Sequence, residues 1–468
     1  MTSRPITSTG KPSTVERLAD WALSIHASDI PRAAIEQAKL LLLDTIGCGL
    51  AASEQHAARN VLAAVANAGG TPQCSVIGGA TKTSLSNAVL ANGVLIRVLD
   101  FNDYVIEPDG SIGGHPSDNM PVALATGEFD NRSGRDVLAA IVIGYELYGR
   151  CKGFLERRSS WDGSSISGII APVMAGWLMQ LDREALSHAV ALSVARTATS
   201  AAVRWGEMSA AKSLANALVA QNGVQAALLA RHGVTGPRAV FDHPRGMQAV
   251  FPKLDAAALT LPLQADSYVM RSNVKTYPCV ATAQAAVSAA LEVHKLIGGD
   301  AAQLSNIRAV MADIPTVRAH QEERDRADPK SHEAADHSLP FLIAAALVDG
   351  TFDLTQFEDE RWNNADVRTV MNRIEMTTDA ALAERAPGSY PCLLEAMAKD
   401  GRSYRAEVLY PPGFSRGALE RKAVIAKFHT LTESRVPRTA RDQIIDAVMT
   451  LNESPSLAAL LAALATAA

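Results

Sequence analysis

The sequence predicts a mainly α-helical protein, in which a large all-helical domain carries an inserted, smaller α+β lid domain. Apolar residues make up 48% of the chain and aromatic residues only 5%, and alanine dominates the apolar share. Alanine-rich segments favour close-packed helices. The alternation of apolar and polar residues that is typical of strands begins only near residue 270, and helical periodicity returns after Pro411. We therefore expect a helical domain over residues 1–270, a lid over residues 271–408, and C-terminal helices over residues 409–468 that return to the helical domain.

The helical part begins with a capped helix over residues 13–25. Ser13 and Glu16 have the spacing of a capping box, in which the two side chains bond backbone N–H groups at the start of a helix. Pro31 suits the first turn of the next helix. That helix, residues 32–52, is apolar almost all round, which is typical of a helix in the core. The same periodicity predicts helices over residues 57–67, 84–96, 136–148, 169–181, 183–196 and 213–231.

The expected lid mixes strands with helices. Strands are predicted over residues 305–312 and 373–377, and the clearest hairpin spans residues 392–410 with its turn at Asp400-Gly401. Two helices, over residues 282–296 and 338–348, are expected among these strands. The C-terminal helices are predicted over residues 418–431, 439–451 and 457–468.

Charge and cysteine content exclude several classes of function. A formal net charge of −5 without a dense basic block argues against nucleic acid or an anionic membrane as a partner. The five cysteines are widely spaced and form no CxxC pair, which argues against a zinc site, an iron–sulfur cluster or a disulfide framework. The N-terminus lacks the apolar core of a signal peptide, and no apolar run reaches the roughly 18 residues of a membrane span. We therefore expect a cytoplasmic protein without a metal site.

One polar stretch, residues 97–119, lies between two segments whose apolar pattern predicts buried helices. An Asp or Tyr close to a His can supply a general base and a general acid. The alternative interpretation is a capped helix end followed by a turn rich in Asp and Asn. The candidate residues for catalysis or substrate binding in this stretch are Arg97, Asp100, Asp103, Tyr104, His115 and Ser117.

Two lysines stand apart from the surface ones. Lys212 begins an Ala-rich helix with little other charge. Lys275 lies where the helical periodicity gives way to the alternation that is typical of strands. A buried ammonium group needs an anionic partner because an unpaired buried charge is costly. A ligand carboxylate would serve, although each lysine alone could instead extend along apolar surface to reach solvent.

Two further clusters allow competing interpretations. The segment Asp328–Ser338 holds His332 and His337, whose spacing of five does not place two metal ligands on one helix face, so a structural or interface cluster is favoured over a metal site. The hydroxyl-rich segment Trp161–Gly168 could bind a carboxylate or could be an ordinary helix-capping loop.

Several segments together resemble the MmgE/PrpD family, which includes 2-methylcitrate dehydratase, cis-aconitate decarboxylase and an iminodisuccinate epimerase. The resemblance covers nearly the whole chain, and its combination of segments is specific. These segments are Leu41-Leu-Leu-Asp-Thr-Ile-Gly-Cys, Arg97-Val-Leu-Asp-Phe-Asn-Asp, Gly114-His-Pro-Ser-Asp-Asn, Gly206-Glu-Met-Ser-Ala-Ala-Lys, Asn222-Gly-Val-Gln-Ala-Ala-Leu-Leu-Ala-Arg, Gly233-Val-Thr-Gly-Pro, Val274-Lys-Thr-Tyr-Pro and Ala335-Asp-His-Ser-Leu-Pro.

The resemblance implies a helical domain with an α+β lid, a homodimer and no metal cofactor. Asp100, His115, Lys212 and Lys275 fall on the active-site positions of the family. Tyr104 stands where the family usually has Thr, and Val105 where the dehydratases often have Trp. The loop Glu107–Gly113 also departs from the dehydratase pattern, so we expect substrate preference to depend on Tyr104 and this loop.

The function that we expect is a cofactor-independent lyase for a small di- or tricarboxylate, dehydrating 2-methylcitrate to 2-methylaconitate. Lys212 and Lys275 would bind carboxylates and stabilise the charge that develops on them. Asp100 and His115 would share the acid and base roles, and Tyr104 would orient the substrate or donate a proton. Decarboxylation of cis-aconitate and epimerisation next to a carboxylate stay open within the family. A non-catalytic, dimeric carboxylate-binding protein is the alternative from another class.

Overall fold

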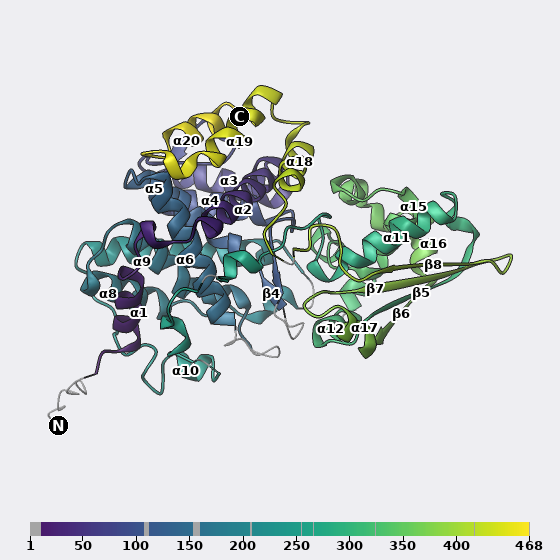
Figure 1. Ribbon diagram of the computed structural model, residues 1–468, viewed down its shortest axis with the longest axis horizontal. Helices are drawn as coiled ribbons and strands as arrows, with labels where there is room; N and C mark the ends of the chain where they lie inside the picture. The colour runs from purple at the N-terminus through teal and green to yellow at the C-terminus, as the bar shows by residue number, and fades with distance from the viewer. Residues whose placement is uncertain are drawn as a thin grey trace.

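The computed structural model describes residues 11–106, 112–152, 160–205, 208–253, 255–264, 266–322, 324–415 and 417–467, and this part of the chain is mainly helical (Figure 1). Its buried apolar residues form two hydrophobic cores. Helices surround the first core, whereas the second is built on a four-stranded sheet. No helix in the described ranges is long and apolar enough to cross a membrane.

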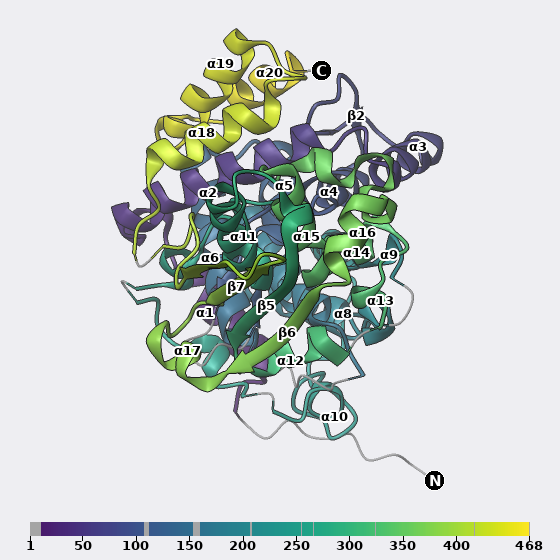
Figure 2. The same cartoon turned by 90° about the vertical axis from the view of Figure 1, so that its right-hand side faces the viewer.

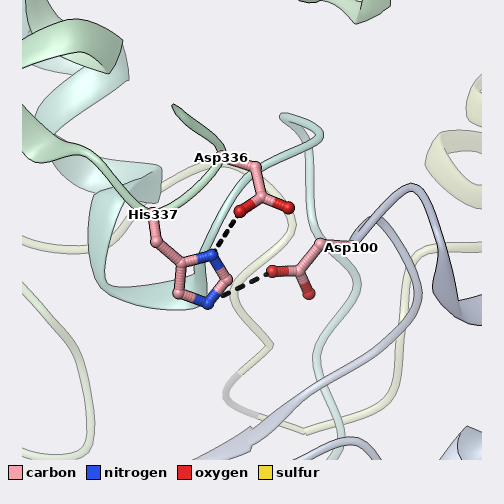
Figure 3. A group of neighbouring side chains, drawn as sticks. All are labelled: Asp100, Asp336 and His337. Atoms are coloured by element: carbon pink, nitrogen blue, oxygen red, sulfur yellow. Dashed lines mark hydrogen bonds and ion pairs between the residues drawn. The ribbon is translucent and has the colours of Figure 1, made fainter. Parts of the chain in front are cut away.

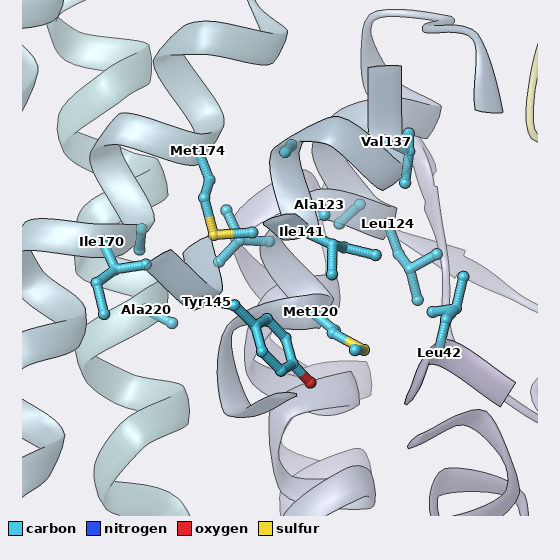
Figure 4. Packing of buried hydrophobic residues seen from close by; sticks show 14 of the residues in the cluster. Leu42, Met120, Ala123, Leu124, Val137, Ile141, Tyr145, Ile170, Met174 and Ala220 are labelled. Atoms are coloured by element: carbon cyan, nitrogen blue, oxygen red, sulfur yellow. The ribbon is translucent and has the colours of Figure 1, made fainter. Parts of the chain in front are cut away.

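The first core is formed by closely packed helices from the N-terminal half. The capping box is confirmed: the Ser13 backbone N–H and hydroxyl both lie 2.8 Å from the Glu16 carboxylate. Figure 4 shows how Tyr145 and Met174 meet other apolar side chains in this core. The helices are α1 (Thr14–Leu23), α2 (Arg32–Ala51), α3 (His56–Ala68), α4 (Leu85–Arg97), α5 (Met120–Phe129), α6 (Gly134–Lys152), α7 (Ser167–Leu178), α8 (Arg183–Val194), α9 (Ala211–Arg231) and α10 (Met247–Val250).

The second core lies against a sheet with strand order β6-β5-β7-β8. Strand β5 (Leu304–Ala312) is parallel to β6 (Ile374–Asp379). Strand β7 (Cys392–Ala398) is antiparallel both to β5 and to β8 (Ser403–Val408). The predicted hairpin is confirmed, and Gly401 takes the left-handed conformation, φ +90°, that its turn requires. Figure 1 shows α11 (Gln284–Leu296), α15 (Leu339–Asp349) and α16 (Ala365–Met371) on one face of this sheet.

Shorter elements complete both parts of the chain. Two small hairpins in the first part were not predicted, because their strands have only two or three residues and no readable alternation. These elements are β1 (Cys74–Ser75), β2 (Lys82–Thr83), β3 (Val105–Ile106), β4 (Ile112–Gly114), α12 (Pro315–Glu322), α13 (Arg324–Ala327), α14 (His332–Ala335) and α17 (Ala380–Arg385).

The chain returns to the first core at its C-terminal end. Helices α18 (Arg421–Thr432), α19 (Arg438–Met449) and α20 (Ala458–Ala465) contribute residues to that core, and Figure 2 shows α18 beside α2. The buried carboxylate of Asp44 on α2 lies 2.7 Å from the Lys427 ammonium on α18. The buried residues of the second core all lie between Cys279 and Val408. That this segment is an inserted domain that closes as a lid stays a prediction.

Candidate active site

The end of α4 places one buried carboxylate at the centre of the site. The helix ends at Arg97, and three residues later Asp100 has φ +46°, a left-handed conformation that few residues other than glycine adopt. Asp is among the residues that tolerate this region, at a cost of roughly 1–3 kcal/mol that the surrounding structure must offset. Asp100 is 1% exposed. Such strained residues concentrate at functional sites.

Three cations surround the Asp100 carboxylate. Its Oδ1 accepts hydrogen bonds from Arg97 Nη1 and from Lys275 Nζ at 2.7 Å, and the same ammonium lies 2.6 Å from the Asp100 carbonyl oxygen. Lys212 Nζ lies 3.9 Å from Oδ2, which accepts no hydrogen bond within the described ranges. Burial opposes ionisation, but Arg97, Lys275 and Lys212 together hold the pKa of Asp100 well below its usual value. Asp100 is therefore an anion that positions cations, and its expected share in the acid and base roles stays a prediction.

His115 presents an unprotonated ring nitrogen to this carboxylate. Its Nδ1 lies 2.6 Å from the Asp103 carbonyl oxygen, which can only accept, so Nδ1 carries the proton. Nε2 then holds a lone pair and lies 3.6 Å from Asp100 Oδ1. Burial, with Arg97 and Lys275 nearby, lowers the pKa of His115 well below its usual value, so the ring is neutral. A neutral imidazole of this tautomer is suited to act as a general base at Nε2.

The backbone just before His115 packs closely against the Tyr148 hydroxyl. Gly114 has φ +86°, and a Cβ atom there would lie 2.2 Å from the Tyr148 hydroxyl oxygen. The His115 backbone N–H donates to that same hydroxyl at 3.1 Å. Only glycine fits this position without displacing Tyr148.

Asp103 and Ser117 are buried and bond to neighbouring groups of the protein. Asp103 accepts from the Tyr145 hydroxyl at 2.7 Å and from the Ser117 backbone N–H at 3.3 Å. The Ser117 hydroxyl accepts from Asn102 at 2.8 Å. Burial raises the pKa of Asp103 to about 7. These bonds shape the loop, and the expected contact of both residues with substrate stays a prediction.

Tyr104 joins the polar stretch to the segment that carries Lys275. Its backbone N–H and carbonyl exchange hydrogen bonds with Asn273 at 2.9 and 2.8 Å. The side chain is buried, and burial, with Tyr390 and Cys279 nearby, raises the pKa of the Tyr104 phenol. The phenol is therefore protonated at neutral pH. Of the loop expected to set substrate preference with Tyr104, residues 107–111 lie outside the described residues.

The second part of the chain contributes an acid–imidazole pair that sequence reasoning missed. Both oxygens of Asp336 lie 2.9 Å from Lys212 Nζ at the start of α9. His337 Nδ1 bonds to Asp336, and its Nε2 lies 3.6 Å from Asp100 Oδ2 (Figure 3). The sequence predicts a structural or interface role for the cluster Asp328–Ser338, and the structure agrees for His332, whose ring stacks on Phe357 at a centroid distance of 4.7 Å. The overlooked signal was an Asp-His pair immediately before the Ser338 cap of an apolar helix.

A lysine ammonium lies among the groups that could hold a metal ion. Oxygen and nitrogen atoms of Asp100, Asp336 and His337 lie within 4.8 Å of one another. The Lys212 ammonium already takes the cationic place among them, 2.9 Å from Asp336 and 3.9 Å from Asp100. Arg97, Lys212 and Lys275 give three positive charges against the three carboxylates that they contact, because Arg97 Nε also lies 3.7 Å from Asp118 Oδ2. A metal ion would have to compete with the Lys212 ammonium for Asp100 and Asp336.

The hydroxyl-rich segment Trp161–Gly168 contains a helix cap, and carboxylate binding by this segment stays a prediction. The Asp162 carboxylate accepts from the Ser164 backbone N–H at 2.9 Å and from Arg204 at 2.7 Å. The Ser167 hydroxyl donates to Asn216 at 2.6 Å. Asp162 therefore stabilises the 3-10 turn Gly163–Ile166 that leads into α7, and Ser167 links α7 to α9.

Comparisons with known proteins match this chain along most of its length. Residues 16–259 match the MmgE/PrpD N-terminal domain, and residues 277–452 match the MmgE/PrpD C-terminal domain. A cis-aconitate decarboxylase-like protein of Aspergillus oryzae is 26% identical, covering 97% of this chain and 98% of the relative. A 2-methylcitrate dehydratase of Cupriavidus necator is 27% identical over 88% of this chain and 89% of its own. A human cis-aconitate decarboxylase is 24% identical over 90% and 88%.

Proposed function

The chain belongs to the MmgE/PrpD family, and from this premise we propose that it is a cofactor-independent hydro-lyase that dehydrates 2-methylcitrate to 2-methylaconitate. The observation that carries the proposal is the neutral imidazole of His115, whose Nε2 lone pair lies beside a cluster of three cations. Dehydration needs a base for a C–H proton next to a carboxylate, and cations to hold that carboxylate. The relatives named as 2-methylcitrate dehydratases support this choice of substrate.

In this reaction His115 Nε2 takes the proton from the carbon next to a substrate carboxylate. Negative charge then develops on that carboxylate, where the ammonium groups of Lys212 and Lys275 stabilise it. Asp100 holds these ammonium groups in place. The electron pair forms the carbon–carbon double bond, and the β-hydroxyl leaves as water once it has received a proton.

The test is the growth of ultraviolet absorbance from the conjugated product, with chelator-treated enzyme and 2-methylcitrate. We expect His115→Gln to lower kcat by about 10²–10⁴-fold, the usual contribution of a general base. His232→Gln, an exposed histidine after α9, is the matched control and should leave kcat unchanged. Loss of the signal on chelation, or a His115→Gln variant with more than a tenth of wild-type kcat, would contradict the proposal.

Decarboxylation of cis-aconitate is the second candidate. The Aspergillus oryzae relative, named as cis-aconitate decarboxylase-like, covers nearly the whole chain. The departure from the dehydratase pattern at Val105 also favours it. Product analysis by NMR in deuterated water separates the reactions, since decarboxylation releases CO2, dehydration releases water, and epimerisation places deuterium in recovered substrate.

The remaining alternatives are tested with the same substrates. Binding of carboxylates without turnover by any of them would support a non-catalytic binding protein. Turnover that is lost in Lys275→Ala would support an enzyme. We also propose a homodimer located in the cytoplasm, and light scattering should give twice the mass of the chain.

A further inference from the structure

Two imidazole rings flank the buried carboxylate of Asp100. His115 Nε2 lies 3.6 Å from Asp100 Oδ1, and His337 Nε2 lies 3.6 Å from Asp100 Oδ2. His115 follows α4 in the part of the chain that builds the first core, whereas His337 directly precedes α15 of the second core. Figure 3 shows the His337 ring between Asp336 and Asp100.

The group behind each ring fixes its orientation. Lys212 and the His337 contact hold the pKa of the buried Asp336 at about 2, so this carboxylate is ionised and can only accept hydrogen bonds. Its bond to His337 therefore places a proton on Nδ1. The Asp103 carbonyl does the same for Nδ1 of His115. Both rings thus turn Nε2 towards Asp100.

The two rings differ in the charge behind them. His115 has a neutral carbonyl at Nδ1, whereas His337 has a carboxylate. A carboxylate at this position orients the ring and stabilises its protonated form, as in an Asp-His pair of a hydrolase. Burial and Lys212 lower the pKa of His337 to about 4 in the free protein. A polyanionic substrate that engages Lys212 would offset this effect and favour the imidazolium.

We propose that His337 is the second catalytic residue of the site, the acid that protonates the departing hydroxyl, and that Asp336 is its positioning residue. This inference rests on the proposed dehydration and names the proton donor that it needs. It also assigns the two halves of the reaction to different parts of the chain, because the base follows α4 and the acid precedes α15.

The proton balance closes through the two rings and solvent water. His115 Nε2 takes the C–H proton, the C–H electrons become the double bond, and the C–O bond breaks with its electrons on oxygen. His337 Nε2–H supplies the proton that makes the leaving group water. The pair then consists of a protonated His115 and a neutral His337. Asp100, with an oxygen 3.6 Å from each Nε2, stays ionised between the rings, so His115 releases its proton to solvent water and His337 takes one up before the next turnover.

The sharpest test removes the need for an acid. The test uses a substrate analogue with fluorine in place of the departing hydroxyl. Fluoride leaves without being protonated, and a fluoride electrode measures its release. For His337→Gln we expect kcat for the hydroxy substrate to fall about 100-fold and fluoride release by less than fivefold. His115→Gln should lose both reactions. Asp336→Asn should show the same pattern with a smaller fall in kcat for the hydroxy substrate, because it only misorients the His337 ring.

His294→Gln, on α11 in the second core, is the control, since its ring bonds the Leu347 carbonyl away from the site. It should leave both reactions at wild-type rates. A His337→Gln variant that loses both reactions equally would make His337 a structural contact between the cores. One that keeps both would exclude any role. Either result overturns the inference.

A measurement without substrate separates this inference from the proposed function. Nitrogen-15 NMR of histidine-labelled wild type and His337→Gln assigns the His337 ring by difference. We expect the proton on Nδ1, and a proton on Nε2 alone would overturn the inference whatever the substrate is. A wild type that eliminates neither water nor fluoride would instead refute the proposed dehydration. The NMR measurement would still show whether Nδ1 or Nε2 of His337 carries the proton.

Discussion

Asp100 decides the arrangement of the cations around it. Arg97 and Lys275 contact its Oδ1, and Lys212 approaches its Oδ2. Without this carboxylate the three buried cations would have only Asp118, beside Arg97, and Asp336, beside Lys212, to balance them, at a high desolvation cost. The left-handed backbone of Asp100 has the same cause, because the carboxylate must reach cations from α4, α9 and the segment before α11. Strain at one residue is offset by three charge-assisted contacts.

Asp103 gives a prediction about pH. Its pKa is raised from 3.8 to about 7, so the folded state binds this proton more tightly than the unfolded chain. Its contribution is fully favourable below about pH 4 and is lost as the pH rises to about 7. We expect the wild type to lose a few kcal/mol of unfolding free energy relative to Asp103→Asn between pH 4.5 and 8. Urea unfolding of both proteins measures this, and parallel pH curves would contradict it.

At the scale of elements, the crossing of α4 and α9 sets the distance between the two sides of the site. A Cβ atom at Gly93 would lie 2.7 Å from Ala217 Cβ, so these helices touch through their smallest residues. The first helix ends at Arg97, and the second begins beside Lys212. The separation of these two cations therefore depends on one glycine.

We expect Gly93→Ala to separate these helices and to destabilise the fold by about 1–3 kcal/mol, as overpacked cores do. The kcat/KM should fall as well, because Arg97 and Lys212 move apart. The matched double variant Gly93→Ala with Ala217→Gly removes the clash and should recover most of both losses, as measured by urea unfolding and by turnover. A single variant as stable and active as the wild type would show that the contact is not tight.

The sequence was informative where structure is local. The helices α2, α4 and α9 and the hairpin at Asp400-Gly401 follow from periodicity and turn residues that a short window contains. Asp100, His115, Lys212 and Lys275 also meet in the structure as the family resemblance implied. The pairing of Lys212 with Asp336 could not be predicted, because it joins residues 124 positions apart whose segments meet only in the folded chain. The orientation of the His115 ring could not be predicted either, because it depends on the Asp103 carbonyl, which the folded loop brings within hydrogen-bonding distance.

At the scale of the whole molecule, the site lies where the two cores meet. Asp100 and Lys212 come from the part that builds the first core, and Asp336 and His337 from the part that builds the second. Polar contacts between them include Lys212 with Asp336 and the Ser331 hydroxyl with the Met208 carbonyl at 3.4 Å. A polyanion bound to Lys212 and Lys275 would tie the two parts together.

This arrangement predicts that one ligand protects two segments far apart in the chain. With saturating tricarballylate, a tricarboxylate that has no hydroxyl to lose, we expect slower amide hydrogen exchange both at residues 97–106 with 112–119 and at residues 331–338. Both changes should be lost in Lys275→Met and kept in Lys399→Met, an exposed lysine near the hairpin turn. The hairpin at residues 396–405 is the internal control, because it lies at the far end of the sheet in Figure 1. Protection confined to residues 97–119 would mean that the ligand binds the first part alone, and neither closure of a lid nor a catalytic role for His337 would then be supported.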